Sequence, residues 1–343
     1  MLLALVPVAL LLGLLGLGLW AIAGFQRPRT YSVEPITLPG FPGPDARELA
    51  GRALTFVSWN IAWGQGEGSA EDPARPAAEI AASIQKIGVS LRELGADVVL
   101  LQEVDFDSAR SQRVDQALAL ARLAGLPHLA CALSWRTNYL PFPSGPPRDH
   151  WGRVRSGGVI LSRYPIRSCS VELLPKPSSR SAIQRCFYLF RYIQRCELAV
   201  GERLVTVYNV HLEAFDWENR ADQASHLARR LSSELTPLTI CGGDFNTEPP
   251  QSTIPDGPGV QQTADPTQLR IRAVAGLTDV VSTEAHAADP AAWYTYPAGA
   301  ADRRLDYLYA GRAFHPIQVR VAPEVGTPSD HYPLIARLGL DDG

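Results

Sequence analysis

Short apolar segments typical of β-strands alternate with amphipathic helical segments along most of the chain. Residues 54–60 form one such strand, and residues 76–94 carry isoleucine and leucine at helical spacing along one stripe. Residues 97–103 are a short apolar run that ends on polar residues, as buried strands do. The same patterns predict helices at 112–123 and 219–235, and strands at 156–162, 204–211, 237–243, 304–310 and 332–338. This alternation predicts layered α/β architecture with helices covering the sheets.

Composition narrows the class of protein. Apolar residues make up 46% of the 343 residues, which is enough to bury a core and excludes a disordered chain. A net charge of −3 excludes a globally basic protein that coats nucleic acid. The five cysteines contain no C-x-x-C pair, which argues against a zinc cluster. Cys186 and Cys196 can form a disulfide if the chain between them folds back, and ordinary buried thiols are the alternative.

The first 26 residues contain no charged side chain. Twenty-four helical residues reach about 36 Å, enough to cross a hydrocarbon core of about 30 Å. We therefore expect one N-terminal transmembrane helix over residues 1–26 and a single-pass membrane protein. A cleaved signal peptide, followed by secretion, is the alternative because residues 21–23 resemble a cleavage site. Arg27 and Arg29 favour a cytoplasmic domain by the positive-inside rule, and the side of the membrane stays open.

Three further segments complete the predicted organisation. Residues 27–50 contain five prolines without apolar periodicity, which predicts an extended linker. Residues 51–343 carry no second linker of this kind and are expected to form one domain. Residues 249–267 are rich in glycine, proline and polar residues, and we expect a surface loop there.

Polar residues able to bind a metal or a phosphate stand at the ends of several predicted strands. Asn60 and Glu103 end the first two strands. The other candidates follow or begin later strands: His211, Asp244, Asn246, Asp306, Asp330 and His331. Each residue alone has a structural alternative, such as a turn or a surface ion pair. Taken together they favour a site, because layered α/β folds gather ligands and catalysts at the carboxyl ends of strands.

The segments around these residues resemble the endonuclease/exonuclease/phosphatase superfamily. They read W-N-I at Asn60, L-Q-E at Glu103, N-V-H-L at His211, G-G-D-F-N-T from residue 242, R-L-D-Y at Asp306 and S-D-H-Y-P from residue 329. The similarity extends over about residues 53–338. The fold that it implies is a four-layer α/β sandwich, with two mixed sheets face to face and helices outside.

Hydrolysis of a phosphate ester requires a cation that neutralises charge on the phosphate. Oxygen ligands suit Mg²⁺, with Mn²⁺ as the alternative, and we expect Glu103, with Asn60 beside it, to form the metal site. The resemblance implies that Asp244 orients or deprotonates the attacking water and that Asn246 positions this water. No covalent intermediate is needed, because water attacks directly.

The resemblance also implies roles for the remaining polar residues. His331 would contact the phosphoryl oxygens, and Asp306 would fix its ring and favour its charged form. His211 would donate to another phosphate oxygen. Asp330 would contact the metal or the nucleophile.

The predicted function is a membrane-anchored, metal-dependent phosphodiesterase or phosphatase. A lipid or small-molecule phosphoester ranks ahead of nucleic acid, because an anchored enzyme lies beside phospholipid headgroups. A metal-dependent endonuclease acting on DNA or RNA is the first alternative, and an inert membrane-tethered binding module is the second. Residues 151–200 carry eight arginines and one lysine against two glutamates, which suits either a phosphate-rich partner or a solvated face. No protein partner can be inferred from the sequence.

Overall fold

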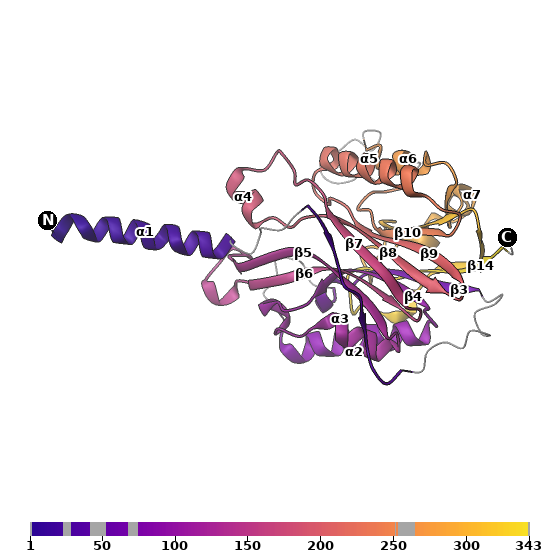
Figure 1. The fold of residues 1–343 in the computed structure, drawn as a ribbon, viewed down its shortest axis with the longest axis horizontal. Helices are drawn as coiled ribbons and strands as arrows, with labels where there is room; N and C mark the ends of the chain where they lie inside the picture. Colours follow the sequence, from indigo (N-terminus) through magenta and orange to yellow (C-terminus); the bar gives the residue numbers. More distant parts are fainter. Residues whose placement is uncertain are drawn as a thin grey trace.

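The computed structural model describes residues 2–22, 29–41, 53–67, 75–250, 252 and 265–341. Within these residues, two seven-stranded sheets lie face to face and helices cover their outer faces (Figure 1). Both sheets mix parallel and antiparallel pairs. The predicted α/β sandwich with two mixed sheets is therefore confirmed.

Sheet A has one parallel pair, β9 with β10, and antiparallel pairs elsewhere. Its strands in spatial order are β1 (Thr30–Ser32), β7 (Ile166–Leu173), β8 (Tyr192–Val200), β9 (Arg203–His211), β10 (Thr239–Asp244), β12 (Asp306–Gly311) and β11 (Leu277–Asp279).

Sheet B likewise has one parallel pair, β3 with β4. Its strands in spatial order are β13 (Phe314–Val321), β14 (Leu334–Leu340), β3 (Leu54–Asn60), β4 (Val98–Asp105), β6 (Gly152–Ser162), β5 (His128–Leu140) and β2 (Ile36–Thr37). In both sheets the parallel pair lies near the centre. Because the two strands of each pair run in the same direction, their carboxyl ends lie at the same edge of the sheet.

The helices form the two outer layers. Helices α2 (Ala77–Glu93) and α3 (Gln116–Ala124) cover sheet B, where the predicted isoleucine stripe of α2 is buried. Helices α5 (Trp217–Glu234) and α6 (Thr267–Arg272) cover sheet A. The shorter helices are α4 (Ala182–Phe187) and α7 (Thr283–Ala288), with 3₁₀ turns at Ala62–Gly64, Ala109–Ser111, Pro147–Asp149, Pro290–Trp293 and Pro323–Val325.

The core between the sheets is largely apolar and contains a buried amide network. Its apolar part includes Phe56 and Leu100 of sheet B and Val207 of sheet A. Gln102 Nε2 donates to Asn209 Oδ1 at 2.7 Å, and Asn209 Nδ2 donates to Gln194 Oε1 at 3.1 Å. Because buried amides are costly when unpaired, this network fixes β4 relative to β8 and β9.

The predicted membrane helix is the main correction. Helix α1 (Leu2–Ile22) extends away from the sandwich (Figure 1). In the described part of the chain, no helix has both the length and the apolar character needed to cross a bilayer. The predicted transmembrane anchor over residues 1–26, and with it the membrane location, is therefore wrong. The prediction counted helical residues through residue 25, whereas α1 is described over Leu2–Ile22 and contains Pro7; residues 23–26 of the predicted anchor lie outside the described residues.

Part of the predicted linker belongs to the sheets. Residues 30–32 pair with β7 and residues 36–37 pair with β5, so this stretch supplies one edge strand to each sheet. Residues 27–28 and 42–50 of the linker lie outside the described residues. So do residues 251 and 253–264 of the predicted surface loop. The domain boundaries stay a prediction.

Candidate active site

Strand register aligns three of the predicted site residues across sheet A. Asp244 ends β10, and its neighbours in register are His211 at the end of β9 and Asp306 at the start of β12. Gly243 permits the close approach of β10 to β9, because a Cβ at this position would lie 1.9 Å from the carbonyl oxygen of Val210. The sheet therefore presents two carboxylates and an imidazole at one level.

Asn60 joins this row to sheet B. It ends β3, and its Nδ2 donates to Asp244 Oδ2 at 3.0 Å and to Glu103 Oε1 at 3.2 Å. Its Oδ1 accepts the backbone N–H of Ala62 at 3.0 Å, which fixes the orientation of the amide. Asn60 thus directs its NH₂ group toward both carboxylates, and its oxygen is already engaged.

Glu103 lies at a register shift in β4, between Leu101 and Val104. Its φ is +54°, a left-handed conformation that costs a non-glycine residue about 1–3 kcal/mol. The side chain is 34% exposed, and its Oε1 lies 3.9 Å from His211 Nε2. The strained bulge therefore presents a partly solvated carboxylate to the site.

Asp244 is buried beneath this edge. Its Oδ1 accepts the backbone N–H of Asn246 at 2.8 Å, and Asn246, at φ +52°, donates its side-chain amide to the Leu212 carbonyl at 3.0 Å. Burial raises the pKa of Asp244 to about 7, although the charge of His331 and the hydrogen bonds from Asn60 and Asn246 favour the ionised form. Asp244 can therefore exchange a proton near neutral pH.

His331 and Asp306 form a buried ion pair. His331 Nδ1 donates to Asp306 Oδ2 at 2.8 Å, and His331 Nε2 lies 3.9 Å from Asp244 Oδ2. Burial lowers the pKa of His331, but the charge and hydrogen bond of Asp306, with the charges of Asp244 and Asp330, raise it to about 10. The imidazole is therefore a cation at neutral pH. The ring of Tyr296 lies beside it, with centroids 4.9 Å apart.

The segment that carries Asp330 and His331 is tied to β3. The Ser329 hydroxyl donates to the Asn60 carbonyl at 2.7 Å, and the indole N–H of Trp59 donates to the His331 carbonyl at 2.8 Å. Burial, together with the negative charge of Glu103, raises the pKa of Asp330 to about 6. Asp330 therefore lies close enough to the cluster to sense its charge.

Arg191 is a site residue that the sequence analysis did not single out. Its Nη1 lies 2.5 Å from Nε2 of the buried His211. Because a guanidinium only donates, His211 Nε2 is the acceptor. Burial, then the charges of Arg191 and His331, place the pKa of His211 well below its ordinary value. His211 is therefore neutral, and the charged donor at this position is Arg191.

Arg191 also forms an ion pair with Glu213. Its Nε lies 3.7 Å from Oε2 of the buried Glu213, and the Tyr188 hydroxyl donates to Glu213 Oε1 at 2.5 Å. The only sequence signal for Arg191 was the high arginine content of residues 151–200, which did not distinguish it from its neighbours.

The structure places all eight predicted residues in one cluster. Direct contacts link six of them: Asn60, Glu103, His211, Asp244, Asp306 and His331. Asn246 bonds to Asp244, and Asp330 precedes His331. Among the described side chains, no group of three or more His, Cys, Asp or Glu has the arrangement of a metal site. The role of each residue stays a prediction.

The arginines of residues 151–200 do not form one open patch. Arg153 pairs with Asp107 at 2.5 Å, and Arg163 pairs with Asp97 at 2.7 Å. Arg155 is buried and donates to the Thr137 carbonyl at 2.7 Å. Much of the positive charge is therefore compensated within the protein.

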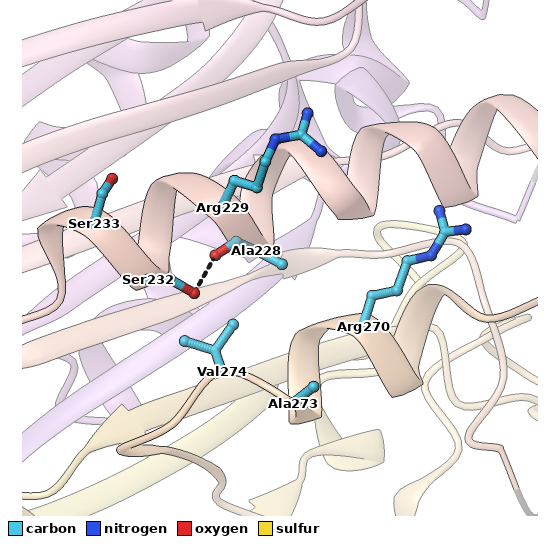
Figure 2. A pocket seen from close by; sticks show the side chains of 7 residues that line it. All are labelled: Ala228, Arg229, Ser232, Ser233, Arg270, Ala273 and Val274. Carbon is cyan, nitrogen blue, oxygen red and sulfur yellow. Dashed lines mark hydrogen bonds between the residues drawn. The ribbon is translucent and has the colours of Figure 1, made fainter.

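An open pocket of about 440 Å³ lies between α5 and α6 (Figure 2). It is lined by Ala228, Arg229, Ser232, Ser233, Arg270, Ala273 and Val274. The Ser232 hydroxyl donates to the Ala228 carbonyl at 2.8 Å, one turn back in α5 (Figure 2). None of the eight predicted residues lines this pocket, so it is separate from the cluster.

Several solved structures have a fold similar to that of this chain. An endonuclease/exonuclease/phosphatase from Beutenbergia cavernae is 23% identical, over 84% of this chain and 72% of that one, with a TM-score of 0.58. TDP2 from Caenorhabditis elegans is 16% identical, over 87% and 77%, with a TM-score of 0.54. A mannosyl-6-phosphatase from Bacteroides thetaiotaomicron is 15% identical, over 83% and 99%, with a TM-score of 0.53. At these identities the likeness shows the fold alone.

A search of curated proteins gives no match to this chain. The sequence model of the endonuclease/exonuclease/phosphatase family matches residues 57–331. This range contains all eight predicted site residues. The chain therefore belongs to the endonuclease/exonuclease/phosphatase family.

Proposed function

We propose that the protein is a divalent-metal-dependent hydrolase of phosphate esters in which an activated water attacks phosphorus directly. The observation that carries this proposal is the position of Asp244 between a cationic imidazole, the side-chain amide of Asn60 and the backbone N–H of Asn246. A carboxylate with a pKa of about 7 can accept a proton from water at neutral pH. Donors on either side can then stabilise the charge that develops on the phosphoryl group.

The residues present fit a hard divalent cation at Glu103. Its carboxylate is partly solvated, and Mg²⁺ usually takes one or two protein carboxylates and keeps several waters. We propose that Glu103 would hold Mg²⁺ or Mn²⁺, and that Asn60, whose oxygen bonds to Ala62, orients Glu103. When bound, such a cation neutralises charge on the phosphate oxygens.

The chain's own residues supply the remaining steps. Asp244 accepts the proton of the attacking water, with one oxygen held by the Asn246 N–H and the other by Asn60. His331, held by Asp306, donates Nε2–H to a phosphoryl oxygen. Arg191 supplies the second positive charge, in place of the donor function predicted for His211.

A small-molecule phosphoester is the substrate class that we favour. Lipid substrates were favoured because a membrane anchor was predicted, and the structure contradicts this anchor. The internal pairing of Arg153 and Arg163 weighs against a groove that tracks a nucleic-acid backbone. A neighbour named mannosyl-6-phosphatase is consistent with a small phosphorylated substrate. An endonuclease acting on DNA or RNA remains the alternative.

Purified full-length protein tests this proposal directly. The assay compares a sugar phosphate, a chromogenic phosphodiester, phospholipid vesicles, plasmid DNA and RNA in the presence of Mg²⁺. We expect hydrolysis of the small esters, its loss after exhaustive chelation, and its recovery when Mg²⁺ or Mn²⁺ is added back. Full activity after chelation would exclude the metal. Cleavage of nucleic acid alone would establish the alternative, and no hydrolysis at all would favour an inert binding module.

Arg191→Met is expected to lower kcat/KM for the same ester at least about tenfold, because the site loses a charged donor while the aliphatic stem remains. The matched control is Arg195→Met, four residues later in β8, where the guanidinium pairs with Glu197 and Glu234 instead. Unchanged kcat/KM in Arg191→Met would show that this guanidinium plays no part in turnover.

A further inference from the structure

Two buried cysteines face each other across neighbouring strands of sheet A. The register pairs Cys169 of β7 directly with Cys196 of β8. Both are free thiols in the core between the sheets, and their Sγ atoms lie 2.7 Å apart. Directly opposed residues of antiparallel strands have Cα atoms about 4.5–5.5 Å apart, within the range of about 4.4–6.8 Å that a disulfide spans. Oxidation of this pair therefore requires no rearrangement of the strands.

We propose that Cys169 and Cys196 are a modification site, at which a small-molecule disulfide oxidises the two thiols to an intramolecular disulfide. One cysteine thiolate attacks the small disulfide, forms a mixed disulfide and releases one small thiol. The second cysteine thiolate then attacks the cysteine sulfur of the mixed disulfide and releases the other small thiol. The dithiol loses two electrons and two protons, and the small disulfide is reduced to two thiols.

The first attack is assigned to Cys169, which is 5% exposed against 0% for Cys196. In the part of the chain that the structure describes, β7 is flanked on its outer side by the three-residue strand β1. Next to β1, the backbone N–H of Val33 donates to the Cys169 carbonyl. Because short edge strands open at low cost, Cys169 can become accessible without global unfolding. Hydrogen bonds from the Cys196 thiol and from Gln194 Nε2 also favour its thiolate.

The other cysteines have different surroundings. Cys241 lies in the separate core beneath α5, and Cys131 packs against the core beneath α2 and α3. Cys186, which the sequence suggested as a partner for Cys196, is a free thiol in α4. Cys196 faces Cys169 instead, so the oxidation is specific to this pair.

The test treats the reduced, folded full-length protein with oxidised glutathione and maps disulfide-linked peptides without reduction. We expect one link, between Cys169 and Cys196, an intact mass lower by two hydrogen atoms, and a Tm higher by about 5 °C. Cys169→Ala and Cys196→Ala should lose both the link and the Tm shift, whereas Cys241→Ala should retain both.

The peptide map of the oxidised chain without substitutions tests the proposal even if a cysteine variant fails to fold. A link between Cys186 and Cys196, or between any other two cysteines, overturns the proposal. So does a chain in which Cys169 and Cys196 stay reduced or carry only glutathione.

Discussion

Asp244→Asn is expected to lower kcat/KM for a phosphoester by at least about 100-fold, the usual contribution of a general base. The substitution keeps the size of the side chain but removes the group that accepts a proton from water. It also replaces one of the two acceptor oxygens by an NH₂ group, although two donors, the Asn246 N–H and Asn60 Nδ2, face this side chain. Because the pKa of Asp244 is about 7, activity of the unsubstituted protein should fall as the pH drops below about 7. The asparagine variant should lack this acidic limb.

Asp97→Asn is the matched control for Asp244→Asn. Asp97 is equally buried but lies before β4, at the opposite end from Glu103, where it accepts from the Thr55 N–H and from Arg163. We expect this variant to lose stability and to keep its activity per folded molecule. Pre-steady-state and steady-state assays of both variants decide between the outcomes. Near-normal turnover by Asp244→Asn would remove Asp244 from the proposed role.

The sequence predicted most accurately the elements that have a continuous apolar surface. The central strands β3 and β4 and helices α2 and α5 lie close to the predicted ranges, because burial on both faces or on one helical stripe leaves a clear pattern. The convergence of the candidate residues also follows from strand order. Parallel pairs at the centre of each sheet bring their carboxyl ends to one edge.

Strands β5, β7, β8 and β13 were not predicted, and their composition explains why. β7 and β8 carry Glu172, Arg195 and Glu197, which are only partly buried, and this polar character resembled a basic surface segment. β13 contains Pro316 and has several exposed residues, as an edge strand tolerates. Such strands are specified by their partners and not by their own pattern.

Two properties of the site could not be predicted because they depend on tertiary contacts. The Asn60 amide is oriented by the Ala62 N–H, so its oxygen does not face Glu103. His211 is buried against Arg191, which directly precedes β8. Burial, together with the charge of Arg191, makes His211 neutral where the sequence analysis expected a donor. Both depend on atomic positions that residue types and spacing leave open.

His331→Ala is expected to lower turnover by at least about 100-fold, because the phosphoryl group loses its buried cationic donor. Asp306→Asn removes the negative charge beside His331 while keeping the size of the side chain that positions its ring. With the Asp306 carboxylate gone, burial is opposed by the weaker effects of Asp244 and Asp330. The pKa of His331 should therefore fall, and the alkaline limb of the pH–rate profile should move from about 10 toward neutral pH. Tyr296→Phe, beside the same ring, should leave this limb in place.

Stability provides an independent measurement of the same pair. The folded-state pKa of His331 is about 10, above its ordinary value of 6.5, so proton binding by His331 stabilises the fold fully below pH 6.5. This contribution is lost as the pH rises from 6.5 through about 10. The difference in unfolding free energy between the unsubstituted protein and Asp306→Asn should therefore be largest below pH 6.5 and shrink toward pH 10. A difference that does not vary with pH would mean that Asp306 supports His331 by packing and not by charge.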